Sequence, residues 1–439
     1  MKYILIIIAT ASSCYAQHNK HWDIANYKRV SFSPATMGAG CLTTTEGVAC
    51  ISNASGAFLF STNGVSVYNS TCAVMANGTG LFGGISSTQS AIIIPLPNSS
   101  TLYYVFTADQ DGGVNGIRYS IVDMSLSGSL GAVTLKNSPL APWMMSEKLC
   151  AVMHCNNRDV WVIAKGWLVN TFTAWLVTPT GITISVASNV GHTPSAVNAK
   201  LGQLKANAQG NRIAAAYYGS GIVEMYQFNN STGVISAPIM NNAIANAYGL
   251  EFSADGSKLY AATNPGVLYQ FDLCNGNNRQ TIINAGAFFG SMQNAIDGRM
   301  YIARGANTSL SALNNPNGLG ASCGFVLSGI NTVTNSSFGL PNFISSYSKP
   351  PINPFTYIDA GCGDVSFSHS GVYQNCYTTD AYTAHWEYPI GTPCSSSITF
   401  PSAGTYNVSY IMNFACHSDT LTQPVIASPG GLFPSITIY

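Results

Sequence analysis

The stretch Gly249–Leu273, GLEFSADGSKLYAATNPGVLYQFDL, constrains the fold most, because it holds three strand-like runs separated by two turn signals. The turn signals are Asp255-Gly256 and Asn264-Pro265-Gly266, whose residue types favour tight turns between antiparallel strands. One such group of strands cannot bury both of its faces, so copies of it should flank the stretch. The stretch therefore predicts most of one β-propeller blade.

Similar groups of strands recur along the chain, with starting points near residues 46, 91, 147, 196, 246 and 288. Their spacing of roughly 45 residues is the period of a four-stranded blade. We therefore predict an all-β fold with a β-propeller of six or seven four-stranded blades. A seventh blade would take its remaining strands from Phe325–Tyr347, and Tyr27–Phe32 would pair with the last blade. An array of β-sandwiches is the alternative, although it would suit a longer period.

Helices should be rare, because no run of ten or more residues shows a clear 3.6-residue apolar stripe. A proline-rich joint at Pro350–Pro354 ends the repeat and has the composition of a linker. Beyond it, the apolar alternation of Gly404–Phe414 and the lone Trp386 suit a small immunoglobulin-like sandwich with Trp386 in its core. The predicted domains are a signal peptide at 1–16, a β-propeller at 17–349 and an immunoglobulin/PKD-like domain at 350–439.

The N-terminus, MKYILIIIATASSCYAQ, has the basic, apolar and small-residue regions of a secretory signal peptide cut before Gln17. Its apolar run is too short to cross a bilayer, and no later segment qualifies. We therefore expect a secreted or cell-surface-associated protein without a transmembrane segment. Lipidation of Cys14 is a less favoured alternative, because Ala11-Ser12-Ser13 lacks the large aliphatic residue that usually precedes a lipidated cysteine.

The chain carries few charges, with charged residues at 8 % and a balance of 17 basic and 17 acidic residues. Typical domains carry about 25 %. Nucleic-acid binding requires a clustered basic surface, and the basic residues here are scattered, so we expect no nucleic-acid partner. A weakly charged surface also favours self-association.

The mature chain would keep eleven of the 12 cysteines, and in an exported protein disulfides are the default. Sequence proximity suggests the pairs Cys41–Cys50 and Cys150–Cys155, while the last four cysteines should pair among themselves. An odd number leaves one thiol unpaired, for which Cys72 is the candidate, or implies an intermolecular bridge. The full set of disulfide candidates is Cys41, Cys50, Cys150, Cys155, Cys274, Cys323, Cys362, Cys376, Cys394 and Cys416.

Several stretches together resemble a known family. They are Glu46–Tyr68, Met75–Leu81, Ser86–Ala91, Leu102–Thr107, Ile117–Met124 and Glu147–Ala164. They resemble the propeller-like N-terminal region of large secreted surface proteins of Bacteroidota, often labelled gliding-motility-associated or type IX secretion cargo. The resemblance covers most of residues 28 to 350 and implies a scaffold without naming a catalytic site.

In that family the propeller is commonly followed by PKD or other immunoglobulin-like modules and a C-terminal sorting domain. Trp386-Glu387-Tyr388 and Ser402–Val408 are similar to the two characteristic strands of a PKD module. The chain departs from the pattern at Pro389-Ile390-Gly391, where a Gly-Asp-Gly turn is expected. It also shows no evident sorting domain, which leaves the secretion route open.

Candidate sites for chemistry are few. Asp109-Gln110-Asp111-Gly112-Gly113 resembles a calcium loop but lacks the later bidentate glutamate, so a hairpin loop is favoured and Asp109 and Asp111 stay weak calcium candidates. Ser253-Ala254-Asp255-Gly256 reads as a β-turn. Cys150, His154 and Cys155 lack a second ligand pair at zinc spacing. The sequence contains neither Gly-x-Ser-x-Gly nor His-Glu-x-x-His, so we expect no catalytic residues and no cofactor.

These observations favour a non-catalytic exported surface protein that binds a glycan or protein ligand through the propeller, for adhesion. One alternative is a structural subunit of an extracellular filament, sheath or matrix that binds copies of itself. A second alternative is a propeller-type lactonase or lyase with its chemistry at the central channel mouth, since the fold hosts many functions. An acidic or histidine cluster around the channel would distinguish this last alternative.

Overall fold

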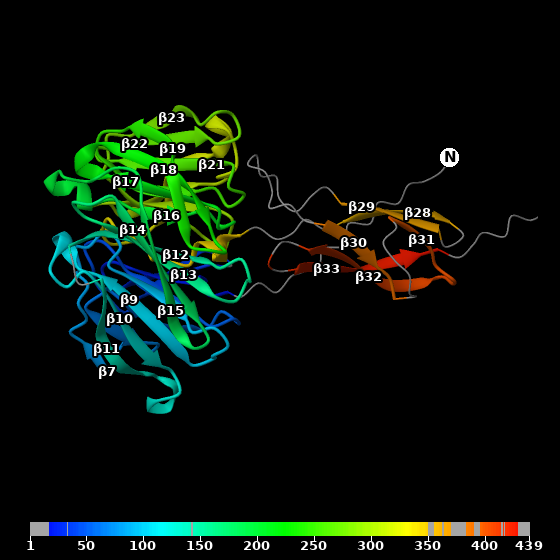
Figure 1. Ribbon diagram of the computed structural model, residues 1–439, viewed down its shortest axis with the longest axis horizontal. Helices are drawn as coiled ribbons and strands as arrows, with labels where there is room; N and C mark the ends of the chain where they lie inside the picture. Colours follow the sequence, from blue (N-terminus) through cyan, green and yellow to red (C-terminus); the bar gives the residue numbers. More distant parts are fainter. Residues whose placement is uncertain are drawn as a thin grey trace, which may run out of the picture. The chain divides into compact units, whose positions relative to one another are not determined.

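The structure is a computed structural model that describes residues 17–32, 34–141, 144–349, 355–361, 364–369, 383–389, 396–413, 416 and 418–428. The predicted signal peptide, the proline-rich joint, Cys362, Cys376 and Cys394 lie outside these residues. The chain forms two compact units, with a boundary between Lys349 and Pro350. Each unit has its own sheets and its own apolar core (Figure 1).

The larger unit, Tyr15–Lys349, is built from antiparallel sheets whose strands follow one another in chain order. Four sheets have four strands each: β12 (Met145–Met153), β13 (Val160–Gly166), β14 (Thr171–Thr178) and β15 (Gly181–Asn189); β16 (Leu204–Ala206), β17 (Arg212–Tyr217), β18 (Ile222–Asn229) and β19 (Val234–Ala243); β20 (Ala247–Phe252), β21 (Lys258–Thr263), β22 (Val267–Asp272) and β23 (Asn278–Asn284); β24 (Phe289–Asn294), β25 (Met300–Arg304), β26 (Ser309–Leu313) and β27 (Phe325–Asn331). The structure therefore confirms the prediction of an all-β chain with repeated groups of four strands.

An eight-stranded sheet contains two further four-stranded groups joined at their outer edges. The groups are β4 (Ala49–Ser52), β5 (Phe58–Thr62), β6 (Ser66–Asn69) and β7 (Val74–Thr79), and β8 (Ala91–Pro95), β9 (Leu102–Ala108), β10 (Ile117–Asp123) and β11 (Ala132–Ala141). Only the parallel pairing of Ala76 with Ala132 joins β7 to β11. Each half therefore repeats the strand order of the other sheets.

The first three strands form a separate sheet of β1 (His21–Ile24), β2 (Lys28–Ser31) and β3 (Thr36–Ala39). Trp22 and Phe32 pack against Tyr301 of β25 on one side. On the other side, the Cys50 thiol of β4 donates a hydrogen bond to the His21 carbonyl at 3.1 Å. The first sheet thus lies between the last sheet of the repeat and the next one along the chain, which closes a propeller-like ring.

Two predictions about ring closure differ from the structure in the strand partners that they assign. Tyr27–Phe32 does not pair with a strand of the last group, because Lys28–Ser31 pairs with β1 and β3 instead. Phe325–Asn331 forms β27, the fourth strand of the β24–β27 sheet, and not part of a further sheet. The sequence pattern identifies strands here but not their partners.

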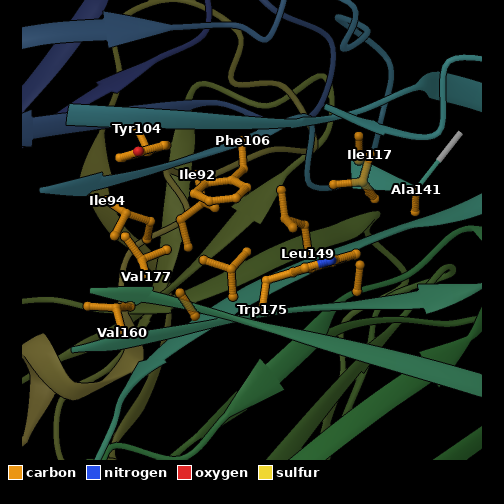
Figure 2. Close-up of a cluster of buried hydrophobic side chains, with 14 of the residues drawn as sticks. Ile92, Ile94, Tyr104, Phe106, Ile117, Ala141, Leu149, Val160, Trp175 and Val177 are labelled. Atoms are coloured by element: carbon orange, nitrogen blue, oxygen red, sulfur yellow. The ribbon is translucent and has the colours of Figure 1, made fainter. Parts of the chain in front are cut away.

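Neighbouring sheets share apolar cores. In the cluster of Figure 2, Ile92 and Phe106 of one sheet face Leu149 and Trp175 of the next. Equivalent clusters join the β12–β15 sheet to the β16–β19 sheet and the β20–β23 sheet to the β24–β27 sheet. Burial of apolar area at about 25 cal/mol per Å² is the main force that holds such sheets together.

The stretch Gly249–Leu273 forms β20, β21 and β22, as predicted. Asp255 makes the first turn, because its carboxylate accepts hydrogen bonds from the Ser257 backbone N–H at 2.9 Å and the Ser253 hydroxyl at 2.6 Å. Gly256 follows with φ +74°, a conformation that favours glycine. The helices of the described residues are short 3₁₀ turns: Gln110–Gly112, Ser127–Ser129, Val197–Lys200, Tyr218–Ser220, Gly320–Cys323 and Ser345–Ser348.

The smaller unit, Pro350–Tyr439, holds two three-stranded sheets. They are β28 (Thr356–Gly361), β29 (Asp364–Ser368) and β31 (Ser397–Thr399), and β30 (Thr383–Glu387), β32 (Gly404–Asn413) and β33 (Ser418–Ala427). Trp386 is 6 % exposed and packs on Phe355 and Phe367 in the core between the sheets. This confirms the prediction that Trp386 is a core residue.

The disulfides differ from the predicted pairs. Cys41 is bonded to Cys72, so neither Cys41–Cys50 nor an unpaired Cys72 is correct. Cys41 follows β3 and Cys72 lies in the turn between β6 and β7, so the bond joins the first sheet to the neighbouring β4–β7 group.

The predicted Cys150–Cys155 bond is also wrong. Cys50, Cys150 and Cys323 are buried free thiols, because they lie in apolar cores that hold no partner sulfur at bonding distance. Cys155, Cys274 and Cys416 each belong to a disulfide.

Candidate functional site at the ring axis

Side-chain amides tie the first strands of different sheets together around the ring axis. Oε1 of Gln89 accepts hydrogen bonds from the backbone N–H groups of Leu149, at 3.2 Å, and Leu204, at 2.7 Å. Oε1 of Gln203 does the same for Leu250, at 3.0 Å, and Met292, at 2.8 Å. Each amide therefore satisfies two buried donors that belong to two sheets.

The segment that follows β27 also enters this region. Pro341 and Ile344 form parallel bridges with Val48 and Ala151 beside the first strands, and Nδ2 of Asn342 donates to the Leu149 carbonyl at 2.7 Å. Deeper along the axis, Nζ of Lys205 contacts Glu251 at 2.9 Å and Gln293 at 2.7 Å. Side chains and this segment therefore fill the axis at these levels.

Acidic and hydroxyl groups gather where the first strands begin. We define the axial cluster as Glu46, Thr88, Glu147 and Tyr248. Oε2 of Glu147 accepts hydrogen bonds from the Thr88 N–H at 2.7 Å and the Thr88 hydroxyl at 2.9 Å. The Thr88 hydroxyl also accepts from the Gly202 N–H at 3.3 Å. Each residue stands at the start of a different group of strands, β4–β7, β8–β11, β12–β15 or β20–β23, so the cluster forms only when these groups pack together.

Burial perturbs the acid groups of the axial cluster. Burial, together with the nearby charges of Glu147 and Asp111, raises the pKa of Glu46 to about 8. Burial likewise raises the pKa of Glu147, against the opposing effect of its hydrogen bonds from Asp111 and Thr88. Perturbed carboxyl groups of this kind are common at functional sites.

Glu46 and Tyr248 are partners within the axial cluster, because a side-chain hydrogen bond between them lowers the pKa of Glu46 and raises that of Tyr248. Tyr248 is 6 % exposed. Burial, followed by the charges of Glu46 and Glu147, raises its pKa, against the opposing effect of a hydrogen bond with Thr88.

The calcium candidates of the sequence lie in the loop between β9 and β10, close to the axial cluster. The Asp109 carboxylate accepts a hydrogen bond from the Asn115 N–H at 3.0 Å and closes the loop. Asp111 donates its N–H to Oε1 of Glu147 at 2.7 Å, while its 71 % exposed side chain pairs with Lys200 at 3.3 Å. The two carboxylates serve different partners, and calcium between them stays a prediction.

Sequence reasoning missed the axial cluster, although a signal for it was present. Glu46 and Glu147 occupy Thr-Glu-Gly and Ser-Glu-Lys at the starts of two repeats, in a chain with only 17 acidic residues. The stretches that carry the family resemblance also supply Glu46, Thr88 and Glu147. Glutamate at the beginning of two repeats was therefore the sequence feature that could have indicated the axial cluster.

Comparisons with known proteins identify no family. No family model and no curated protein match the chain. Similar crystal structures include a protein from Lactobacillus plantarum, with 12 % identity, a TM-score of 0.37 and coverage of 85 % of this chain and 93 % of that one. A protein of unknown function from Bacteroides caccae has 11 % identity, a TM-score of 0.39 and coverage of 64 % and 94 %.

A third structure, of a proposed 6-phosphogluconolactonase from Bacteroides uniformis, has 10 % identity, a TM-score of 0.34 and coverage of 75 % and 98 %. Likenesses this weak carry no argument for function. Among the described residues, no helix has the length and apolar character needed to cross a membrane.

Proposed function

We propose that the protein is an exported, non-catalytic surface protein that binds a glycan or protein ligand through one face of its propeller. Loops that join one sheet to the next, and loops that join the second and third strands of a sheet, emerge at the end of the ring that holds Glu46. This follows from the antiparallel strand order. We call this end the Glu46 face.

The observation that carries the proposal is where apolar side chains are exposed. The four most exposed large apolar side chains among the described residues of the larger unit are Val114 at 82 %, Val197 at 72 %, Val333 at 67 % and Tyr27 at 60 %. All four lie on loops of the Glu46 face. The Asn26 amide, beside Tyr27, donates to the Asn335 carbonyl, beside Val333, so the two loops are neighbours.

Exposed apolar groups gathered on one face commonly mark an interaction site, and loops on a rigid scaffold commonly carry binding function. Leu319, at 53 %, is the comparable side chain on the opposite face. It offers a matched control, because its loop joins the third and fourth strands of a sheet.

The test compares the full chain with a triple variant, Val114→Ser, Val197→Ser and Val333→Ser, on a glycan array and on cultured cells. We expect the wild-type protein and Leu319→Ser to bind, and the triple variant to lose most of the binding. Absence of any ligand, together with a measurable hydrolase turnover, would count against the proposal.

The number of blades and the type of the smaller unit are also part of this proposal. We infer a seven-bladed propeller in which β1, β2 and β3 form the seventh blade and Ser336–Ile344 takes the place of its first strand. The packing of β1–β3 between two four-stranded sheets supports this count. For the smaller unit we propose an immunoglobulin/PKD-like module, supported by its two sheets and the buried Trp386.

A lactonase or lyase activity is a second candidate, because an acidic cluster does lie at the ring axis. With its raised pKa, Glu46 stays protonated near neutral pH, and a protonated carboxyl group in a cleft can act as a general acid. Turnover of a panel of lactones that Glu46→Gln abolishes would favour this candidate. The filament alternative stays a proposal, although Cys72, the candidate for an unpaired thiol, is bonded to Cys41.

A further inference from the structure

We propose that the ligand of the Glu46 face is a neutral saccharide and that it binds on the exposed side chains of Tyr27, Phe288 and Val333. We call these three side chains the Tyr27 patch. The inference rests on the proposed function, because it names the ligand class and the part of the Glu46 face that holds the ligand.

Hydrogen bonds and a ring contact hold the three loops of the patch together. The side-chain amide of Asn26, in the β1–β2 turn, donates to the Asn335 carbonyl. The ring of Phe288, in the loop between β23 and β24, meets the ring of Phe338 edge to face, with 6.4 Å between their centroids. Asn335 and Phe338 both belong to the segment that follows β27 and carries Val333. The Tyr27 patch therefore lies on neighbouring loops.

The side chains of the patch are exposed, Val333 at 67 %, Tyr27 at 60 % and Phe288 at 50 %. Among the described residues, Phe82 is the remaining exposed aromatic side chain, at 41 %, and its ring lies 5.7 Å from the Arg118 guanidinium. Exposed rings offer flat apolar surfaces with a polarised edge and face. Two such rings on neighbouring loops form a platform on which the C–H face of a sugar ring can stack.

Backbone strain is a separate observation at two of these positions. Tyr27 has φ +56° and Val333 has φ +67°, in the left-handed region that bulky and β-branched residues rarely adopt. Glycine or asparagine would adopt this conformation at lower cost. Burial does not compensate for the strain, because both side chains are exposed. Strain without a stabilising contact commonly marks a functional position.

The surroundings of the patch indicate the charge of the ligand. Lys28 and Arg304 flank the patch loops, but the first is half-buried and the second is 7 % exposed. Anionic ligands are usually held by charged hydrogen bonds from lysine or arginine, so this surface suits an uncharged ligand. The patch loops hold amide and hydroxyl side chains and no Lys, Arg, Asp or Glu in the segments 25–27, 285–288, 305–308 and 331–338.

A saccharide fits these loops better than a protein does. Stable protein interfaces bury about 800 Å² on each partner around an apolar core, whereas the Tyr27 patch has three large apolar side chains set among amides and hydroxyls. A neutral sugar presents an apolar C–H face together with hydroxyl groups. Rings and amides on neighbouring loops match both features.

The test applies the full chain to an array of neutral and anionic glycans. We expect binding to neutral glycans that is unchanged when NaCl is raised from about 0.1 M to about 1 M, because no ion pair contributes. Tyr27→Asn and Val333→Asn should each weaken this binding at least about tenfold, as the loss of an interface anchor does. Both variants should unfold at the same temperature as the wild-type protein or higher, because asparagine tolerates the left-handed region. Weaker binding by a folded protein of equal or greater stability separates a binding role from a structural one.

The matched control is Leu168→Asn. Leu168 is 42 % exposed and has φ +64° on another loop of the Glu46 face, so the same change is made outside the patch. This variant should bind as the wild-type protein does, and equal loss of binding in it would contradict the assignment to the Tyr27 patch.

Three further outcomes would overturn the inference. The first is binding to anionic glycans alone or to no neutral glycan. The second is binding to cells that persists after enzymatic removal of their glycans, which would identify a protein ligand. The third is unchanged binding by Tyr27→Asn and Phe288→Ser while the triple serine variant loses its binding. In the second and third cases the Glu46 face would still be a binding surface, so the proposed function would stand without the saccharide assignment.

Discussion

Arg29 of β2 holds the buried carboxylate of Asp23 in β1 through two hydrogen bonds, from Nε at 2.6 Å and from Nη2 at 3.1 Å. The hydroxyl of Ser61, in the neighbouring β4–β7 group, donates to the same carboxylate at 2.7 Å. The Arg29 guanidinium also stacks on the ring of Phe58 at 3.4 Å. One buried ion pair thus joins the first sheet to the next at the point where the ring closes.

Asp23→Ala should destabilise the protein strongly. The change leaves Arg29 without its partner and Ser61 without its acceptor, and removing one member of a buried pair costs about 3 to 5 kcal/mol. Urea unfolding of the larger unit measures this loss. Arg158→Ala, which removes a half-exposed guanidinium from its pair with Asp159, is the control and should change stability less than Asp23→Ala. Equal effects of the two changes would show that Asp23 has no special role in closure.

Cys72→Ser should also weaken ring closure. The Cys41–Cys72 bond spans 31 residues, and cross-links of this length restrict the unfolded chain by about 3 to 4 kcal/mol. Thermal unfolding with and without a reductant measures this contribution, and reduction should affect Cys72→Ser less than the wild-type protein. Peptide mapping without reduction should recover Cys41 linked to Cys72; a Cys41–Cys50 peptide would contradict the structure.

Gln203→Leu should destabilise the ring axis despite its similar size. It removes the acceptor for two buried N–H groups, those of Leu250 and Met292, and each unsatisfied donor costs about 1 to 3 kcal/mol. We expect a total loss of about 2 to 6 kcal/mol in urea unfolding. Gln110→Leu, on an exposed loop, is the control. A neutral effect of Gln203→Leu would mean that water replaces the amide.

Stability should fall as pH rises through about 8. The folded protein holds the Glu46 proton with a pKa of about 8, against an ordinary value of 4.5. Between these pH values the folded state binds a proton that the unfolded state has released, so rising pH favours unfolding. The stabilising contribution is complete below pH 4.5 and is lost as pH rises through about 8.

Unfolding midpoints measured from pH 5 to 9 test this dependence. The midpoint of the wild-type protein should fall most steeply near pH 8. In Glu46→Gln, which cannot titrate, that part of the decline should be absent. An identical pH profile in the two proteins would show that another group causes the decline.

The sequence predicts local structure well where turn chemistry is explicit. Asp255-Gly256 and Asn264-Pro265-Gly266 locate the turns between β20, β21 and β22, because few residues adopt the conformations that such turns need. The repeat spacing likewise identifies the sheets. Trp386 is predicted as core because a large ring among alternating apolar residues is most stable when buried.

Contacts between distant segments are not encoded in local pattern. Cys50 is closer than Cys72 to Cys41 in the sequence, yet β4 carries Cys50 into an apolar core while the β6–β7 turn brings Cys72 beside Cys41. The axial cluster was missed for the same reason, because Glu46 and Glu147 approach each other only when several sheets have packed into a ring.

Comparison of ligand binding by the wild-type protein, the Val114, Val197 and Val333 triple serine variant and Leu319→Ser tests the central claim most directly. The full chains are applied to the same glycan array and cells at equal concentration. The account predicts that the wild-type protein and Leu319→Ser bind equally. The triple variant should lose most of the binding, although a thermal unfolding experiment shows that it is folded. Equal binding by all three proteins, or loss only in Leu319→Ser, would contradict the assignment of the Glu46 face as the binding surface.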